Sequence, residues 1–267
     1  MPVHFYITKK EDDAYLKQSQ KHQTAFLQTY GIKTVFIEDY SMLVPVLKEI
    51  ENRYNRKYVL IAGSADGYGD WDTRRAELFL YHLGYQLRKK DYQPVSQLGN
   101  NIGKLVMMGA NKWEQGGAKS YRTWTQKVLP PPAEDDADFI SLSYSGIGAC
   151  IYLFGNEKES EELVDTPTWE RELNAFYRSG LNIVPVASTG FAARRMWKRI
   201  SDRPEIYGHC LKYDSPAKET GIFNSLGIPY EEKGIPANGF KDYLDEPELL
   251  PDYGLIQTII RALDINL

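Results

Sequence analysis

The chain has 267 residues, of which 42% are hydrophobic and 25% are charged, and its net charge at pH 7 is −4. This length suits one large domain, or one domain with a smaller additional piece. The acidic balance excludes a general attraction to nucleic acid or to anionic membranes, and no hydrophobic run approaches the length of a membrane span. Cys150 and Cys210 lack a metal-binding spacing, which indicates a reducing, cytoplasmic setting without disulfides.

The first 56 residues predict a βαβα segment. Strand patterns cover 4–8 and 34–37, and helical patterns cover 11–30 and 41–54. Ser41 is the expected N-cap of the second helix. Such a segment is unusual as the start of a domain, so we expect it to belong to a larger structure. Residues 57–267 then form the second domain of the predicted organisation.

In the second domain, buried-strand patterns alternate with small-residue turns and helices. The strands are expected at 58–62, 94–98, 149–154 and 182–187. Helices are expected at 71–89, around 107–113, at 135–144, 168–178, 191–200 and 252–263, and a polar acidic loop is expected at 157–165. Thr166 is the expected N-cap before Pro167. This alternation predicts an α/β fold with a doubly wound, Rossmann-like parallel sheet and helices on both faces.

Each of the four strands ends in a small polar turn. The turns are Gly63-Ser64-Ala65, the segment 99–103, Gly155-Asn156 and Ser188-Thr189-Gly190. Open parallel sheets bind ligands at their carboxyl edge, where all four turns would lie. Small residues and the N–H groups of helix starts suit phosphate, and asparagine side chains suit ribose or base. Any one turn is also ordinary loop chemistry, but the four together favour a shared ligand site.

Charged residues extend this site. Glu172 is expected one turn into the helix beside Gly155, where it would accept two ribose hydroxyls or simply face solvent. Arg122, Lys127 and Lys158 are candidates for phosphate contacts, although each also suits an exposed surface. The expected ligand-binding residues are Gly63, Ser64, Ala65, Asn100, Asn101, Gly103, Arg122, Lys127, Gly155, Asn156, Lys158, Glu172, Ser188, Thr189 and Gly190. The four histidines are scattered, so we expect no catalytic group and no metal site.

Five segments in order carry a family resemblance. They are IAGSA, LGNNIGKLVMMGA, IYLFGN, ERELNAF and IVPVASTGFAARRMW, and they span about 58–199. This region resembles SLOG domains, the superfamily of DprA-like and LOG-like nucleotide-binding folds. It also resembles the C-terminal sensor domain of the sirtuin-like NADase effectors of Thoeris anti-phage defence. Residues 3–54 resemble the closing part of a sirtuin-like domain.

The resemblance implies a regulatory sensor. Such a domain binds a cyclic ADP-ribose isomer made by a TIR enzyme, and binding activates NAD⁺ hydrolysis in a sirtuin-like domain. For this chain it implies a non-catalytic, cytoplasmic, homo-oligomeric module without a cofactor, acting on a sirtuin-like NADase domain in cis or in trans. Valine in place of Gly63 is then expected to abolish ligand binding and to leave the fold largely intact.

Two other functions stay open. The first is a LOG-like phosphoribohydrolase of nucleotide monophosphates. Its PGGxGTxxE signature would fall near 154–172, where this chain has FGN and an acidic insertion before Glu172. The second is a DprA-like nucleic-acid interaction, which the absence of a basic run disfavours.

Overall fold

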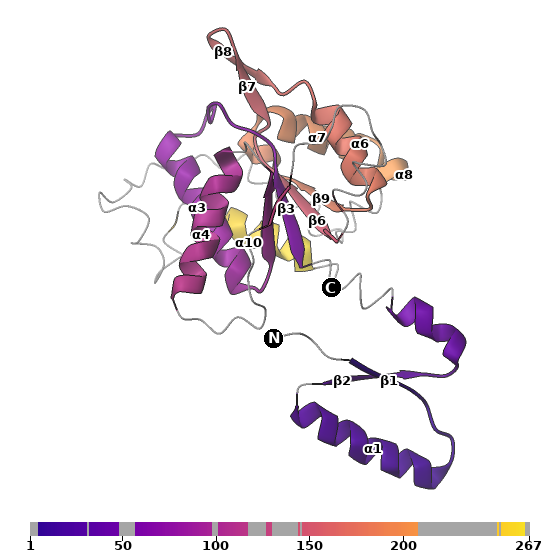
Figure 1. Cartoon of the computed structure of the whole chain (residues 1–267). Helices are drawn as coiled ribbons and strands as arrows, with labels where there is room; N and C mark the ends of the chain where they lie inside the picture. The colour runs from indigo at the N-terminus through magenta and orange to yellow at the C-terminus, as the bar shows by residue number, and fades with distance from the viewer. Residues whose placement is uncertain are drawn as a thin grey trace. The chain divides into compact units, whose positions relative to one another are not determined.

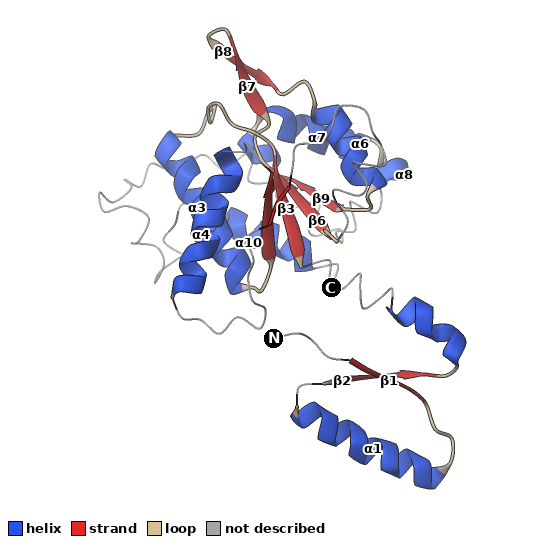
Figure 2. Cartoon of the chain, viewed as in Figure 1, coloured by secondary structure: helices blue, strands red, loops and turns tan. Residues whose placement is uncertain are grey.

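The computed structural model describes residues 5–30, 32–47, 57–97, 101–116, 127–129, 144, 146–207, 250 and 252–264. Within it the chain divides into two compact units. The described parts of the first unit are 5–30 and 32–47, and the described part of the second begins at Lys57. Figures 1 and 2 show the elements of both units.

The first unit is a parallel strand pair with one long helix. Its elements are β1 (Phe5–Lys9), α1 (Ala14–Thr29), β2 (Lys33–Ile37), the 3₁₀-helix η1 (Tyr40–Met42) and helical residues 43–47. β1 and β2 pair in parallel, as expected for strands that a helix connects. The side chain of Gln20 ties α1 to β1 by donating to the Lys9 carbonyl oxygen at 2.7 Å. The expected Ser41 cap is wrong, because the Ser41 N–H instead donates to the side chain of Asp39 at 2.7 Å.

The second unit is built on a five-stranded sheet in the order β5-β4-β3-β6-β9. Its elements are β3 (Tyr58–Ala62), α3 (Thr73–Lys89), β4 (Gln93–Gln97), α4 (Asn101–Gln115), β5 (Lys127–Leu129), β6 (Ala149–Tyr152), β7 (Asn156–Glu159), β8 (Glu162–Asp165), α6 (Trp169–Arg178), β9 (Asn182–Pro185), η2 (Ala187–Thr189), α7 (Phe191–Asp202), α8 (Pro204–Tyr207) and α10 (Tyr253–Asp264). Every pair of neighbouring strands in this sheet is parallel. The predicted parallel α/β fold is therefore confirmed.

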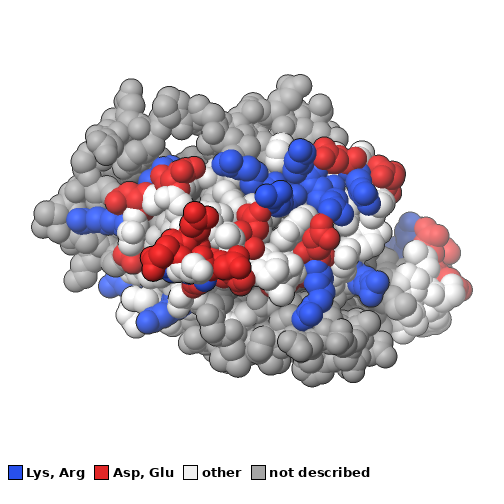
Figure 3. Space-filling view, turned by 90° about the horizontal axis from the view of Figure 1, so that it is seen from above, with Lys and Arg blue, Asp and Glu red and all other residues white. Residues whose placement is uncertain are grey.

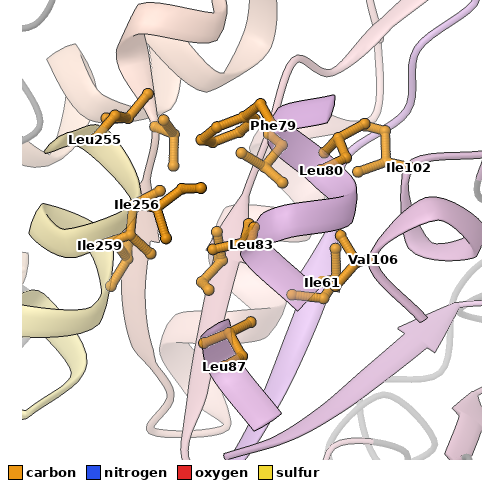
Figure 4. Packing of buried hydrophobic residues seen from close by; sticks show 14 of the residues in the cluster. Ile61, Phe79, Leu80, Leu83, Leu87, Ile102, Val106, Leu255, Ile256 and Ile259 are labelled. Carbon is orange, nitrogen blue, oxygen red and sulfur yellow. The ribbon is translucent and has the colours of Figure 1, made fainter. Parts of the chain in front are cut away.

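Alternate residues of the central strands face two separate cores. Val59 and Ile61 of β3 pack with side chains of α3, α4 and α10, part of which Figure 4 shows at close range. Leu60 and Ala62 pack on the other face with side chains of α6 and α7. A strand covered on both faces needs apolar residues at every position, as the sequence YVLIA provides. The sheet is thus doubly wound, with helices on both faces.

The order of the strands fixes a topological switch point. From β3 the chain winds outward through β4 to β5, and it then returns to the other side of β3 with β6 and β9. The crevice where the winding reverses therefore lies at the carboxyl ends of β3 and β6. In open α/β sheets this crevice is the usual place for a ligand.

Two glycines let α3 and α4 approach each other closely. A Cβ atom on Gly84 would overlap the main-chain oxygen of Val106, and one on Gly109 would overlap that of Tyr81. Beside this crossing, the buried guanidinium of Arg88 pairs with Glu114 of α4. The sequence pattern predicts both helices but not this tight crossing.

A β-hairpin stands where the sequence predicts a polar loop at 157–165. β7 and β8 pair antiparallel, and the hairpin projects from the rest of the second unit (Figure 1). Helix α6 begins at Trp169 with Thr168 as its cap residue, so the predicted Thr166 cap is wrong. The Thr166 hydroxyl lies instead 2.9 Å from the Ser64 hydroxyl. The predicted helix at 135–144 falls outside the described residues except for Tyr144, which lies in a turn.

Candidate functional site

The turns that follow β3, β6 and β9 meet at the switch point. The Ser64 carbonyl oxygen accepts hydrogen bonds from the N–H groups of Gly155 at 2.9 Å and Asn156 at 3.1 Å. The Thr189 hydroxyl accepts the Phe154 N–H at 2.7 Å, which joins the turns after β6 and β9. Three of the four predicted turns are thus brought together at the carboxyl edge of the sheet.

The remaining predicted residues lie elsewhere or are only partly described. Asn101 is exposed at the first residue of α4, and Gly103 is buried inside that helix. Lys127 opens the edge strand β5, with its Cα paired to that of Val95. The side chain of Lys127 and the whole of Asn100 and Arg122 lie outside the described residues.

Gly63 and Gly155 are needed for packing within the protein. Gly63 has φ of +94°, and a Cβ atom there would overlap the main-chain oxygen of Leu153. Gly155 has φ of +81°, and a Cβ atom there would lie 2.7 Å from the Ala192 methyl carbon. The expectation that a side chain at Gly63 leaves the fold intact is therefore wrong. At Gly190, with φ of +82°, an added Cβ would meet no atom of the described residues within 4 Å, apart from its two chain neighbours.

The helix starts near these turns offer fewer free donors than expected. Helix α3 begins only at Thr73, well after the turn at Gly63. At the start of α7, the N–H groups of Ala192 and Ala193 already donate to the carbonyl oxygens of Gly155 at 3.3 Å and Phe154 at 2.8 Å. Two of the N–H groups at the start of α7 are therefore already used within the protein.

Several polar side chains expected at the ligand are used inside the protein. The Ser64 hydroxyl donates to the Asn156 carbonyl oxygen at 2.9 Å. The side chain of Asn156 is completely buried and bonds to the loop after β3. Ser188 takes part only through its main chain, because its carbonyl oxygen accepts the indole N–H of Trp71 at 2.9 Å, whereas its buried hydroxyl has no hydrogen-bond partner among the described residues. These contacts hold the three turns in one arrangement.

Valine in place of Thr189 is expected to lower the free energy of unfolding by about 1–3 kcal/mol, because it leaves the buried Phe154 N–H without its hydrogen-bond acceptor, whereas the Val186 carbonyl oxygen still accepts the Thr189 main-chain N–H at 3.0 Å. The Thr189 hydroxyl both accepts the Phe154 N–H and donates to the Val186 carbonyl oxygen at 2.7 Å. Urea unfolding of Thr189→Val and of Thr189→Ser measures this effect. The serine variant keeps the hydroxyl and should stay close to wild type, whereas equal losses in both variants would show that these two hydrogen bonds contribute little.

Glu172 lies beside Gly155, as the sequence predicts. Its carboxylate accepts a hydrogen bond from the Tyr152 hydroxyl at 2.7 Å. That hydroxyl would lie 3.0 Å from a Cβ atom on Gly155. Burial raises the pKa of Glu172, whereas the Tyr152 hydrogen bond acts in the opposite direction. The carboxylate of Glu172, a residue that is half-buried as a whole, is therefore held at the carboxyl edge by a fully buried tyrosine.

The backbone at this edge is strained in two places. Phe154 has φ of +55° and Phe191 has φ of +47°, which non-glycine residues seldom adopt. The Phe191 ring packs against Gly69, because a Cβ atom on that glycine would lie 2.6 Å from the ring. Trp71 and Tyr68 make edge contacts with the Phe154 ring. Strained residues of this kind tend to cluster at functional sites.

Charged side chains of both signs cover this end of the second unit, and Figure 3 shows basic and acidic side chains gathered in neighbouring groups. Arg195 of α7 pairs with Asp165 of β8. Lys158 lies 3.4 Å from Glu161 within the hairpin. Arg194, in the first turn of α7, is exposed, and no ion pair with a described residue involves it. Arg194 is therefore a candidate phosphate partner that the sequence did not single out.

Other residues of this region are also absent from the sequence prediction. Tyr152 is the last residue of the buried strand β6. Its hydroxyl acts at the site by donating to the Glu172 carboxylate, and Glu172 is distant in sequence. Trp71 and Thr166 likewise act through partners on other elements. In the part of the chain that the structure describes, no cluster of three potential metal-binding side chains occurs. Every described helix is too short or too polar to cross a bilayer.

Comparison with known proteins places this fold in a family. Residues 43–219 match the Sir2- and TIR-associating SLOG family, STALD. The NAD(+) hydrolase ThsA of Bacillus cereus (strain MSX-D12) is 27% identical over 219 residues, which cover 76% of this chain and 46% of that protein. The protein of the same name from Acinetobacter baumannii (strain 532279) is 27% identical over 213 residues, covering 74% of this chain and 44% of the relative. The ThsA of Cytobacillus dafuensis is 25% identical over 213 residues, which cover 72% of this chain and 42% of that protein.

The chain thus spans less than half of the length of each of these relatives. The family match covers most of the second unit and includes the turns after β3, β6 and β9. Together with the doubly wound parallel sheet, this match establishes that the chain belongs to the Sir2- and TIR-associating SLOG family.

Proposed function

We propose that the second unit is a regulatory sensor that binds a cyclic ADP-ribose isomer at the carboxyl edge of its sheet. The observation that carries this proposal is the meeting of three turns at the switch point, beside the carboxylate of the half-buried residue Glu172. Membership of a TIR-associating family supports a signal made by a TIR enzyme. The strained backbone at Phe154 and Phe191 supports a functional role for the same edge.

In this proposal Glu172 binds ribose hydroxyls. A carboxylate accepts hydrogen bonds from two hydroxyl groups, and such charge-assisted bonds are worth about 1.5–3 kcal/mol each. The Tyr152 hydroxyl occupies one carboxylate oxygen of Glu172 and fixes its direction. Open space beside Gly190 leaves room for the ligand, and the exposed Arg194 is the basic group proposed for its phosphates.

Glutamine in place of Glu172 is expected to weaken binding of a cyclic ADP-ribose isomer by about tenfold or more, since about 1.4 kcal/mol is one decade. Calorimetry on Glu172→Gln and wild type measures this change. Glu170→Gln is the control, because Glu170 lies on the same helix and pairs with Arg199. Equal affinities in Glu172→Gln and wild type would place the ribose elsewhere.

The same site predicts a pH dependence. The carboxylate form of Glu172 binds the hydroxyls, and burial raises its pKa above the ordinary value of 4.5. The affinity for the ligand should therefore be highest at pH values above this raised pKa, and it should fall as the pH decreases through the pKa. Calorimetry across the acidic range should show a fall in wild type and a much flatter profile in Glu172→Gln. Parallel profiles in the two proteins would contradict the role of this carboxyl group.

The proposed output is activation of an NAD⁺-hydrolysing effector in anti-phage defence. The relatives bear the name NAD(+) hydrolase, and we propose that a sirtuin-like NADase domain, in cis or in trans, is the partner of this sensor. Among the described residues, most exposed large hydrophobic side chains belong to the first unit, including Tyr15, Phe26 and Tyr40. Helix α1 buries none of its described side chains. Parallel sheets are normally covered on both faces. This rule supports the proposal that a sirtuin-like domain packs on the exposed apolar side chains of the first unit. We also propose that the protein assembles as a homo-oligomer.

A second candidate is the LOG-like release of the base from a nucleotide monophosphate. The raised pKa of Glu172 favours it, because a catalytic carboxyl group needs a pKa closer to neutrality. The turn at Gly155, which lacks the LOG signature, disfavours it. Incubation with AMP distinguishes the two functions: release of free adenine supports the hydrolase, whereas saturable binding of a cyclic ADP-ribose isomer without release supports the sensor.

A further inference from the structure

The side chain of Asn156 is completely buried at the start of β7. Its amide oxygen accepts the N–H groups of Asp66 at 3.0 Å and Gly67 at 3.3 Å. Its amide nitrogen donates to the Gly67 carbonyl oxygen at 2.9 Å. The amide group is therefore committed to residues 64–67, the loop that follows β3. A ligand at the carboxyl edge could reach this amide only by displacing these bonds.

The same loop is joined to the β7–β8 hairpin at further points. The Ser64 hydroxyl donates to the Asn156 carbonyl oxygen at 2.9 Å. The Asp66 carboxylate accepts the Lys158 N–H at 2.8 Å. Gly67 lies against the Leu163 side chain, since a Cβ atom on that glycine would come within 2.7 Å of a Leu163 methyl group. Two segments distant in sequence are thus connected by side-chain and main-chain bonds.

We infer that Asn156 is a positioning residue that fixes the loop 64–67 to the β7–β8 hairpin and so sets the shape of the ligand edge without contacting the ligand. The expected effect of Asn156 on ligand affinity rests on the proposed function, whereas its expected effect on the order of the loop 64–67 does not. A buried amide that satisfies two N–H groups and one carbonyl oxygen holds a turn more firmly than sterics alone. Any ligand that orders or shifts this loop should also shift the hairpin.

Amide hydrogen exchange measured by NMR on the whole chain tests the effect on the loop. In Asn156→Ala, exchange at the Asp66 and Gly67 amides should be at least about tenfold faster than in wild type, because local opening no longer breaks a hydrogen bond. Asn174→Ala is the matched control, since Asn174 is exposed on α6. Unchanged exchange at both amides in folded Asn156→Ala would overturn the inference.

Asn156→Asp keeps the test decisive if the alanine variant does not fold. Its carboxylate can still accept both N–H groups, but it lacks the donor to the Gly67 carbonyl oxygen. Exchange at the two amides in Asn156→Asp should therefore exceed that in Asn174→Ala, and this comparison does not need the alanine variant. If Asn156→Ala folds, exchange should rise less in Asn156→Asp than in Asn156→Ala. Exchange equal to wild type in the aspartate variant would count against the inference.

Calorimetry and exchange with a cyclic ADP-ribose isomer separate positioning from direct contact. Positioning predicts that Asn156→Ala binds more weakly and that saturating ligand restores protection of the Asp66 and Gly67 amides. Weaker binding together with wild-type exchange in the free protein would identify a direct contact and overturn the inference. Absence of binding in wild type would instead reject the proposed function, and the exchange measurements on the free variants would still decide the role of Asn156.

Discussion

Gly63→Ala is expected to abolish cooperative folding of the second unit. The φ of Gly63 is +94°, and a Cβ atom there would overlap the Leu153 carbonyl oxygen. The strain of a non-glycine residue at positive φ costs about 1–3 kcal/mol by itself. The overlap adds a larger cost, because it would separate β3 from β6 at the centre of the sheet. Urea unfolding followed by circular dichroism measures the outcome.

Gly190→Ala is the matched control for this prediction. Gly190 has φ of +82°, but an added Cβ would meet no neighbouring atom within 4 Å. Its alanine variant should therefore show only the backbone strain of about 1–3 kcal/mol. Similar free energies of unfolding for the two variants would contradict the prediction, because they would mean that the contact between Gly63 and Leu153 relaxes at little cost.

Gly84→Ala is expected to lower the free energy of unfolding by at least about 3 kcal/mol, the upper range for an overpacked core. The Cβ atom would overlap the Val106 main-chain oxygen, and the helices are also joined by the ion pair between buried Arg88 and partly exposed Glu114. Helix propensity alone favours alanine over glycine by about 1 kcal/mol, so the predicted loss has the opposite sign to the local effect.

Gly254→Ala in α10 isolates that local effect. Gly254 lies in a helix, and an added Cβ meets nothing within 4 Å in the part of the chain that the structure describes. This variant should therefore be unchanged or more stable by up to about 1 kcal/mol. Because α3 and α4 cross closely, the change in the free energy of unfolding measured in urea should have opposite signs for Gly84→Ala and Gly254→Ala. If both substitutions stabilised the protein, the crossing would not require glycine at position 84.

The sheet can be predicted from the sequence because each strand is marked by neighbouring residues along the chain. The run at 58–62 is apolar at every position after Tyr58, and this is what a strand covered on both faces requires. The small residues that follow mark the carboxyl ends of the strands. From these two features the parallel order and the meeting of the turns follow by topology alone.

The parts that the sequence does not predict depend on distant partners. A glycine such as Gly84 looks like a weak helix residue until its neighbour Val106 is known. Asn156 suggests a ligand contact because an asparagine amide is well suited to bind a ligand. Its hydrogen bonds to Asp66 and Gly67 could not be foreseen, because these residues lie far from it in the sequence. The hairpin is missed because its two strands, NEKE and ELVD, are short and mostly charged and do not alternate apolar with polar residues, and a charged segment normally indicates a loop.

The central claim is that a nucleotide-derived signal binds at the carboxyl edge of the sheet. Calorimetric titration of the whole chain with ADP-ribose, its cyclic isomers, NAD⁺ and AMP tests it most directly. We predict saturable binding of a cyclic ADP-ribose isomer to wild type and binding about tenfold weaker or worse to Glu172→Gln. Absence of binding for every cyclic isomer, with the fold intact by circular dichroism, would contradict the claim.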